Sequence, residues 1–319
     1  MTTTPAPEPA ATEALIAPDE APGEPGGTDR RTRLLVVGAA ATTLVLWASA
    51  FVSIRDLGES VTPGALSLGR LLVAAVALGL LLVGRPKRWP TRRDVPLLLV
   101  CGSMWLGVYN LALNDAERRI DAGTAALVVQ VGPIVVALLA TVFLGEVLHR
   151  WLVVGMVVGF GGVLVIARAS SQSSEADLVG VGLAVVAALT YAVGVLAQKP
   201  LVSRVGPLEV TFLACLVGAA VCLPWTGDLV ATVREGDASV LLQIAYLGVF
   251  PTAIAFTTWA YALSHSDAGT LALTTFLVPL LATLMAWMLL DEVPPPLAFV
   301  GGLLCIGGVA LTRVRPRAR

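Results

Sequence analysis

Long apolar stretches separated by short polar clusters run through most of the chain. A helix of about 20 residues spans the roughly 30 Å of hydrocarbon in a bilayer. Only helices and closed barrels satisfy their backbone groups in lipid, and barrel strands would alternate with period two, which these stretches do not. The pattern therefore predicts an all-α integral membrane protein with ten transmembrane helices. The predicted spans are 34–54, 63–84, 95–115, 122–144, 151–167, 178–197, 207–225, 240–263, 268–290 and 296–312.

Composition agrees with a chain that lies in lipid. Of 319 residues, 56% are hydrophobic and 13% are charged, against about 25% charged in soluble domains. The four cysteines all lie inside apolar stretches, without CxxC spacing or a neighbouring histidine. We therefore expect packing or lipid-facing cysteines and no metal site.

The two ends of the chain differ from the spans. Residues 1–29 are rich in Ala, Pro, Thr, Glu and Gly and lack Lys and Arg, so we expect a disordered tail. Residues 313–319 form a basic tail. An alternative makes the first span a secretory signal, because Arg30-Arg31 precedes it and Ala48-Ser49-Ala50 resembles a cleavage site. Cleavage would leave nine spans and break the repeat described next, so we expect a retained helix.

The chain contains an internal repeat. A shift of 146 residues holds without a gap from Asp121 to Gly162 and matches polar, Gly and Pro positions. It aligns Asp121-Ala122-Gly123-Thr124 with Asp267-Ala268-Gly269-Thr270, Pro133 with Pro279, Glu146-Val147 with Glu292-Val293, Gly155 with Gly301, and Gly161-Gly162 with Gly307-Gly308.

A weaker match at a shift of 144 places Trp47 on Tyr191, Arg55 on Lys199 and Pro63 on Pro207. Each half, 34–168 and 178–312, thus contributes five spans. Because five is odd, the second half must enter the membrane from the opposite side, which makes the repeat inverted, as in many secondary transporters.

The distribution of basic residues predicts the orientation. With the N-terminus inside, fifteen of the 21 Lys and Arg lie on the cytoplasmic side, five on the other side, and Arg70 lies within a span. The positive-inside rule therefore predicts cytoplasmic N- and C-termini in the inner (plasma) membrane.

Several of these motifs together resemble a known family. Trp47-Ala48-Ser49-Ala50-Phe51, then Pro63 and Arg70, and the paired Pro and Glu positions of the repeat are similar to EamA-type transporters of the drug/metabolite transporter superfamily. The resemblance covers about residues 34–312. It implies ten helices around a central cavity, alternating access, and transport of amino acids, sugars or other small metabolites.

Arg70 is the only basic residue inside a predicted span. A charge at mid-membrane costs about 2.5–3.5 kcal/mol on insertion scales, so it needs a partner. Arg70 either faces the cavity and attracts a carboxylate, or reaches outward toward Asp56, Glu59 or lipid phosphates. The shift of 144 places Ala214 opposite it, so this charge belongs to one half alone.

Polar and aromatic residues within the spans are the other binding candidates. In the third span, Trp105 and Tyr109 lie four apart, as do Asn110 and Asn114, and form one broad face. The remaining candidates are Trp47, Gln130, Tyr191, Gln198, Thr257, Thr258, Trp259 and Tyr261. The competing interpretation is an interfacial aromatic belt or polar bonds between helices.

Two pairs of repeated positions carry a structural expectation. Pro133 and Pro279 lie within helices, where a missing amide donor frees a carbonyl; such paired breaks indicate either a transport site and gate or fixed packing kinks. Glu146 and Glu292 end their helices, and we expect them to bind loop amides or nearby basic groups.

These observations favour a secondary transporter that exports a small neutral or zwitterionic metabolite, such as an amino acid, by alternating access. A membrane-embedded receptor or enzyme, or a channel, is the alternative, but no P-loop, nucleophile set, histidine cluster or filter-like run occurs. No carboxylate lies at the centre of a span, and only edge residues such as Asp115 or Glu117 remain for ion coupling. The expected partners are a small-molecule substrate and the lipid bilayer, with no cofactor and no nucleic acid; the oligomeric state is left open.

Overall fold

The computed structural model describes residues 26–57, 60–120, 122–170, 177–290 and 295–314. Most of the predicted N-terminal tail and most of the basic C-terminal tail therefore lie outside the described residues, as do Asp121 and Glu292. The chain divides into two units, Met1–Leu35 and Val36–Arg319. The described part of the first unit belongs to helix α1, which begins at Gly26, and the second unit carries everything that follows.

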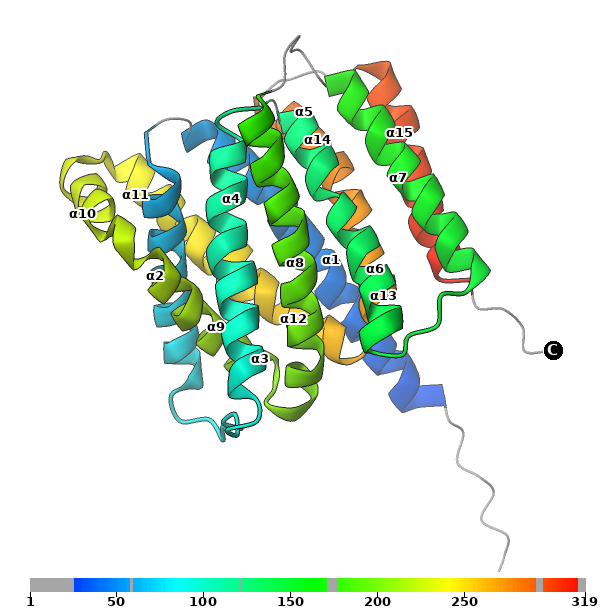
Figure 1. Cartoon of the computed structure of the whole chain (residues 1–319), viewed down its shortest axis with the longest axis horizontal. Coiled ribbons are helices and arrows are strands. Elements are labelled where there is room, and N and C mark those ends of the chain that lie inside the picture. The colour runs from blue at the N-terminus through cyan, green and yellow to red at the C-terminus, as the bar shows by residue number, and fades with distance from the viewer. Residues whose placement is uncertain (1–25, 58–59, 121, 171–176, 291–294, 315–319) are drawn as a thin grey trace, which may run out of the picture. The chain divides into compact units, whose positions relative to one another are not determined.

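The described residues form helices joined by short connections, without a β-strand among them. Four of the long helices are interrupted by short π-helical or 3-10 segments, which we label η1 to η4; Figure 1 shows the arrangement of the α-helices. The helices are α1 (Gly26–Leu57), α2 (Pro63–Leu82), α3 (Val95–Val100), η1 (Cys101–Val108), α4 (Tyr109–Ala116), α5 (Ala122–Val129), α6 (Val131–Phe143), α7 (Arg150–Ser170), α8 (Leu178–Arg204), α9 (Pro207–Cys222), η2 (Leu223–Trp225), α10 (Thr226–Glu235), α11 (Ala238–Leu247), η3 (Gly248–Ile254), α12 (Ala255–Ser264), α13 (Ala268–Leu273), η4 (Thr274–Leu277), α14 (Val278–Leu290) and α15 (Pro296–Thr312).

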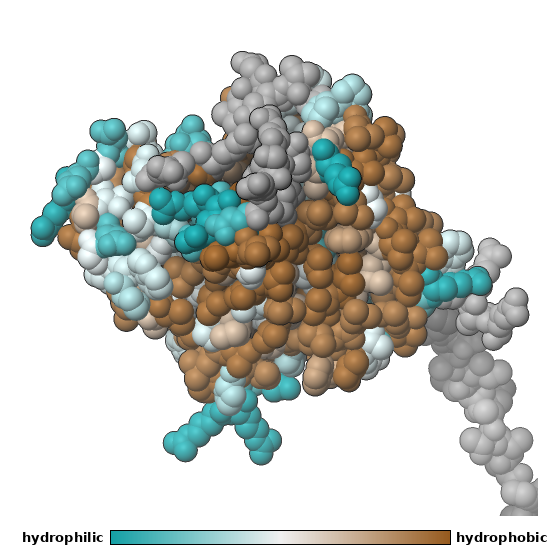
Figure 2. Space-filling model, turned by 45° about the horizontal axis from the view of Figure 1, so that its top comes forward, coloured by the Kyte–Doolittle hydropathy of each residue, from teal (hydrophilic) through white to brown (hydrophobic). Residues whose placement is uncertain are grey.

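The helices follow the ten predicted spans. Among the described residues, 8 helices are long and apolar enough to cross a membrane, and the shorter apolar helices Leu127–Phe143 and Pro296–Thr312 supply the other two. Figure 2 shows hydrophobic side chains across the middle of one face, with hydrophilic side chains gathered above and below them. This arrangement fits a belt of lipid and confirms a multi-pass membrane protein.

Two helix ends differ from the prediction. α8 continues to Arg204 rather than ending near residue 197, and the seventh span continues through η2 into α10. Charged residues do not stop a helix at the membrane surface, because their long side chains reach water while the backbone remains hydrogen-bonded. α10 buries none of its residues, which explains why no apolar pattern marked it.

The packing of α7 against α15 shows that the two repeats run in opposite directions. A Cβ atom added to Gly155 would lie 2.5 Å from the Gly308 carbonyl oxygen, and one added to Gly162 would lie 2.5 Å from that of Gly301. As the residue number rises in α7 it falls in α15, so these helices are antiparallel. Gly155 and Gly301 occupy equivalent repeat positions, as do Gly162 and Gly308, and an antiparallel pair of equivalent helices requires an inverted repeat.

The irregular segments also repeat. The π-helical segment η1 in the third span corresponds to η3 in the eighth span at a shift of about 146 residues. The break at Gln130 between α5 and α6 corresponds in the same way to the 3-10 segment η4 between α13 and α14. The duplicated sequence therefore produced duplicated helix breaks, and π-helical turns are frequent at functional sites.

Candidate functional site

Five aromatic side chains from both repeats meet in the core of the second unit. They are Trp47 of α1, Trp105 of η1, Tyr191 of α8, and Phe256 and Trp259 of α12, and we call them the aromatic cluster. The ring centroids of Trp105 and Phe256 lie 4.9 Å apart, and those of Trp47 and Trp259 lie 5.1 Å apart. Trp47 is half-buried and the other four are buried. The interfacial-belt interpretation does not hold for these residues, since a belt residue would face the headgroups.

Several polar atoms at the aromatic cluster lack a hydrogen bond. The buried indole Nε1 atoms of Trp47 and Trp259 have no acceptor, and the buried Oε1 of Gln198, two turns along α8 from Tyr191, has no donor. The hydroxyl of Tyr191 lies near Thr275 but does not form a hydrogen bond with it. Buried polar atoms in native proteins are almost always paired. An apolar site with a few converging unpaired groups is the usual setting of a ligand.

Gln130 joins the two broken helices. Its Nε2 donates to the backbone carbonyl of Thr275 at 2.7 Å. In a continuous α-helix that carbonyl would accept from the amide of residue 279, but Pro279 has none. The side chain at the break in the first repeat thus satisfies the carbonyl freed in the second. Pro133 and Pro279 lie in the first turn of α6 and of α14, where proline is tolerated, and the break precedes each of them.

Arg70 is buried and turns toward the second repeat. Only 5% of the residue is exposed, and its Nε donates to the Thr252 hydroxyl in η3 at 2.9 Å. Thr252 donates in turn to the Leu247 carbonyl at 2.7 Å, a bond across five residues that is typical of π-helical geometry. The outward interpretation finds no support in Asp56, which accepts a hydrogen bond from Gln243 instead.

The predicted face of the third span packs against both α2 and α8. Asn114 donates from Nδ2 to the Ser67 hydroxyl at 3.1 Å, and Asn110 donates to the Leu106 carbonyl at 2.8 Å. The ring of Tyr109 lies 6.2 Å from that of Tyr191, and Tyr109 interacts electrostatically with Arg70. Tyr109 therefore interacts both with Arg70 and with a ring of the aromatic cluster.

Glu117 belongs to the same polar group. The sequence had shown only that Glu117 lies at the edge of a span. It follows Asn114 by three residues at the end of α4, and its Oε1 is buried without a hydrogen bond. A cleft of about 400 Å³ opens nearby, between the first residues of α2 and α8, α4 and Trp225, with Asp115 in its wall. Ser67 and Thr252 were also missed, because hydroxyls in an apolar span carry no distinguishing signal.

The structure separates some candidates from this site. Thr258 pairs with the Thr43 hydroxyl of α1 at 2.8 Å, which is a contact between helices. Thr257 donates to the Ala253 carbonyl of its own helix. The ring of Tyr261 contacts that of His265, with the centroids 4.5 Å apart and the planes tilted by 42°. The contacts of these three side chains are contacts within or between helices, and they give no support for a role in binding substrate.

Polar contacts close the opposite end of the helices. Glu146 accepts from the amides of Ala268 and Gly269 at 2.6 and 2.9 Å, which confirms that this carboxylate binds loop amides at the start of α13; Glu292 lies outside the described residues. Lys199 donates from Nζ to the carbonyls of Leu263 and Ser266. The Glu146 bonds join the residues after α6 to α13 across the two repeats, and the Lys199 bonds join α8 to the end of α12 within the second repeat.

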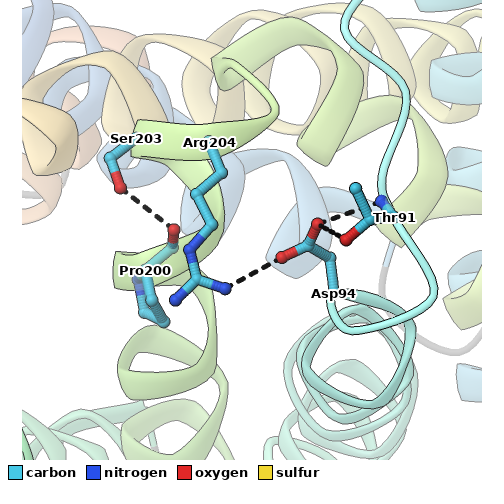
Figure 3. Close-up of polar contacts among 5 residues, drawn as sticks. All are labelled: Thr91, Asp94, Pro200, Ser203 and Arg204. Atoms are coloured by element: carbon cyan, nitrogen blue, oxygen red, sulfur yellow. Dashed lines mark hydrogen bonds and ion pairs between the residues drawn. The ribbon is translucent and has the colours of Figure 1, made fainter.

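Asp94 and Arg204 make a further tie at this end, as Figure 3 shows. Arg204 Nη1 lies 3.0 Å from Asp94 Oδ1, and the amide and hydroxyl of Thr91 donate to Asp94 Oδ2 at 3.0 and 2.7 Å. The bonds from Thr91, followed by that from Arg204, lower the pKa of Asp94. We call this the Asp94 end and the opposite one, with the cleft, the Glu117 end.

The whole length of both repeats matches one family model. The model of the EamA-like transporter family matches residues 34–168 and again residues 178–314. The chain belongs to the EamA-like transporter family. Family membership identifies a membrane transporter of a small molecule rather than an enzyme.

Individual relatives are named as exporters. The chain is 37% identical over 283 residues to a probable terminal-alkyne amino-acid exporter of Streptantibioticus cattleyicolor, covering 89% of this chain and 95% of that one. It is 25% identical to a probable amino-acid metabolite efflux pump of Escherichia coli, over 85% of this chain and 92% of that one. It is 30% identical to a pseudopaline exporter of Pseudomonas aeruginosa, over 70% of this chain and 78% of that one.

A solved crystal structure shares the fold. It superimposes with a TM-score of 0.70, covers 87% of this chain and 96% of the other, and is 22% identical in sequence.

Proposed function

We propose that this EamA-family transporter exports an amino acid with an apolar side chain by alternating access. The observation that carries the proposal is the aromatic cluster, which both repeats build and which holds unpaired indole donors. Its rings offer a surface for an apolar side chain, and the buried Arg70 nearby offers a cation for a carboxylate. The names of the relatives in Streptantibioticus and Escherichia coli support amino acids as the substrate class and export as the direction.

The two ends of the helices support alternating access. The Asp94 end is held by bonds from Glu146, Lys199 and Arg204, whereas the Glu117 end carries the cleft. With both termini in the cytoplasm, as the basic residues predict, the cleft lies on the outer face. Export then requires the bonds at the Asp94 end to break while the Glu117 end closes, and the two repeats, 34–168 and 178–312, are the moving halves.

The test is efflux of radiolabelled L-propargylglycine, an amino acid with a terminal alkyne, from loaded proteoliposomes. We expect saturable efflux by the wild type and at least about a tenfold loss of initial rate in Trp259→Leu, because a buried aromatic anchor contributes about 2 kcal/mol or more. Trp287→Leu is the matched control, since Trp287 is 42% exposed on α14. Efflux that rises linearly with concentration would indicate a channel, and efflux absent for every amino acid tried would refute the proposal.

A further inference from the structure

A carboxylate at the Glu117 end has a buried oxygen atom without a hydrogen-bond partner. Glu117 Oε1 is buried and unpaired, and burying an uncompensated carboxylate is costly. Glu117 lies on the face of the third span that carries Asn110 and Asn114, one turn beyond the hydrogen bond from Asn114 to Ser67. The side chain therefore belongs to the interface between α4 and α2.

The complementary charge is Arg70. It lies three residues beyond Ser67 on α2, on the opposite side of the Asn114 bond, and it interacts electrostatically with Glu117. Among the described residues, however, Arg70 has only the hydrogen bond from Nε to Thr252, and it makes no direct ion pair with Glu117. A buried guanidinium and a partly buried carboxylate thus interact electrostatically without forming an ion pair.

Other charged groups do not neutralise this carboxylate. Asp115, Arg119 and Asp177 form a chain of ion pairs at the surface, at 3.4 and 3.5 Å. The remaining titratable groups that face the site are Tyr109 of α4, which interacts with both charges, and Cys215 of α9, which interacts with Arg70. In the described structure, Arg70 is the one cation that acts on Glu117.

We propose that Arg70 and Glu117 together bind the head group of the exported amino acid. The guanidinium takes the α-carboxylate with its free Nη donors, and the Glu117 carboxylate takes the α-ammonium. A zwitterion pairs with both protein charges at once, whereas a ligand with a single charge pairs with only one of them. Tyr109 interacts with Arg70 and lies beside Tyr191 of the aromatic cluster, so a ligand whose head group binds here can place its side chain against those rings. This assignment deepens the proposed function and rests on it.

The head-group site implies a dependence on pH. Burial raises the pKa of the Glu117 carboxyl to about 7, and Arg70 opposes this rise. A protonated carboxyl no longer attracts an ammonium, so affinity is present above this pKa and weakens as the pH falls through it, by about tenfold per pH unit below it. A Glu117→Gln variant keeps every other titratable group, so it isolates the contribution of this carboxyl.

The experiment compares three probes that share the alkyne and differ in charge. L-propargylglycine carries both charges, but-3-yn-1-amine lacks the carboxylate, and pent-4-ynoate lacks the ammonium. We expect each single-charge probe to bind the detergent-purified wild type roughly ten- to a hundredfold more weakly than the amino acid, from the loss of one charge-assisted contact. This comparison uses the wild type and does not depend on how any variant folds.

Substitutions then assign each charge to a residue. Glu117→Gln should weaken L-propargylglycine roughly ten- to a hundredfold, leave pent-4-ynoate unchanged and flatten the pH profile. Arg70→Gln should leave but-3-yn-1-amine unchanged. Glu235→Gln, which removes an exposed carboxylate on α10, should behave as the wild type.

The outcomes separate the two proposals. If the wild type binds no amino acid saturably, the proposed function fails and the head-group site with it. If the wild type binds L-propargylglycine but binds the single-charge probes equally well, or if Glu117→Gln matches Glu235→Gln, the head-group site is refuted while the proposed function stands.

Discussion

At the residue scale, the site depends on side chains of the first repeat that form hydrogen bonds with the irregular segments of the second. Gln130 satisfies the Thr275 carbonyl that Pro279 leaves without a donor, and Arg70 binds the Thr252 hydroxyl within η3. In hydrocarbon, no water is present to form hydrogen bonds with these polar groups. A single polar side chain therefore decides whether an irregular segment is stable at that depth.

Gln130→Leu tests this dependence. The substitution keeps the size of the side chain but leaves the buried Thr275 carbonyl unpaired, so we expect a loss of stability of about 1–3 kcal/mol. Thermal unfolding in detergent, followed by fluorescence of the buried tryptophans, measures it. The control Gln243→Leu affects a hydrogen bond at the exposed Asp56 and should cost much less. Equal costs for the two variants would mean that the broken helices do not need the Gln130 bond.

At the element scale, α7 and α15 approach each other through glycines. Gly159 and Cys305 occupy equivalent repeat positions and contact each other, with Cys305 Sγ 3.6 Å from the Gly159 carbonyl. The pseudo-twofold axis of the repeat therefore passes close to this contact. Small residues allow the two backbones to approach this closely. Such close packing stabilises helix pairs in lipid, where the hydrophobic effect does not drive helices together.

Two adjacent glycines of α7 should respond to alanine in opposite directions. A Cβ at Gly162 would lie 2.6 Å from the Cys305 amide nitrogen, whereas one at Gly161 would have no atom within 4 Å. Gly162→Ala should destabilise the protein by about 1–3 kcal/mol through overpacking. Gly161→Ala should stabilise it by about 0.4–1 kcal/mol through lower unfolded-state entropy. Thermal unfolding of the pair measures both, and the same sign for both would contradict the α7–α15 contact.

At the scale of the whole molecule, the inverted repeat places equivalent elements at opposite faces of the membrane. The breaks η1 and η3, and those at Gln130 and η4, come from one duplicated sequence, yet only the first half carries a charge at the position of Arg70. Opposite Arg70 the second half has Ala214, which is buried. Duplication built the scaffold, and divergence made its binding site asymmetric.

Cysteine labelling tests the orientation of the molecule. Ser239→Cys, in the first turn of α11, should react with an impermeant thiol reagent from outside intact cells, and Arg92→Cys, before α3, should react only after lysis. Both positions are exposed. The four native cysteines are buried and free, so they should give little background. The reverse pattern would invert the predicted topology and place the cleft on the cytoplasmic face.

The sequence by itself determined the class of protein, the ten spans, the inverted repeat and the family. Each of these depends on local or repeated patterns: apolar length against the thickness of a bilayer, an odd number of spans per repeat, and matched Gly, Pro and Glu positions. It also identified most members of the aromatic cluster, because large polar-aromatic residues are rare in apolar helices.

Only the tertiary structure decided how these residues are grouped. Thr258 forms a hydrogen bond with Thr43 of α1, and Glu117, at the end of a helix, has a buried Oε1 atom and interacts electrostatically with Arg70. Phe256 joins the rings, and Thr252 and Ser67 anchor the charged and amide side chains. A helix has a face toward every neighbour, and which face meets which helix depends on packing across the whole chain, a long-range property that spacing within one span does not contain.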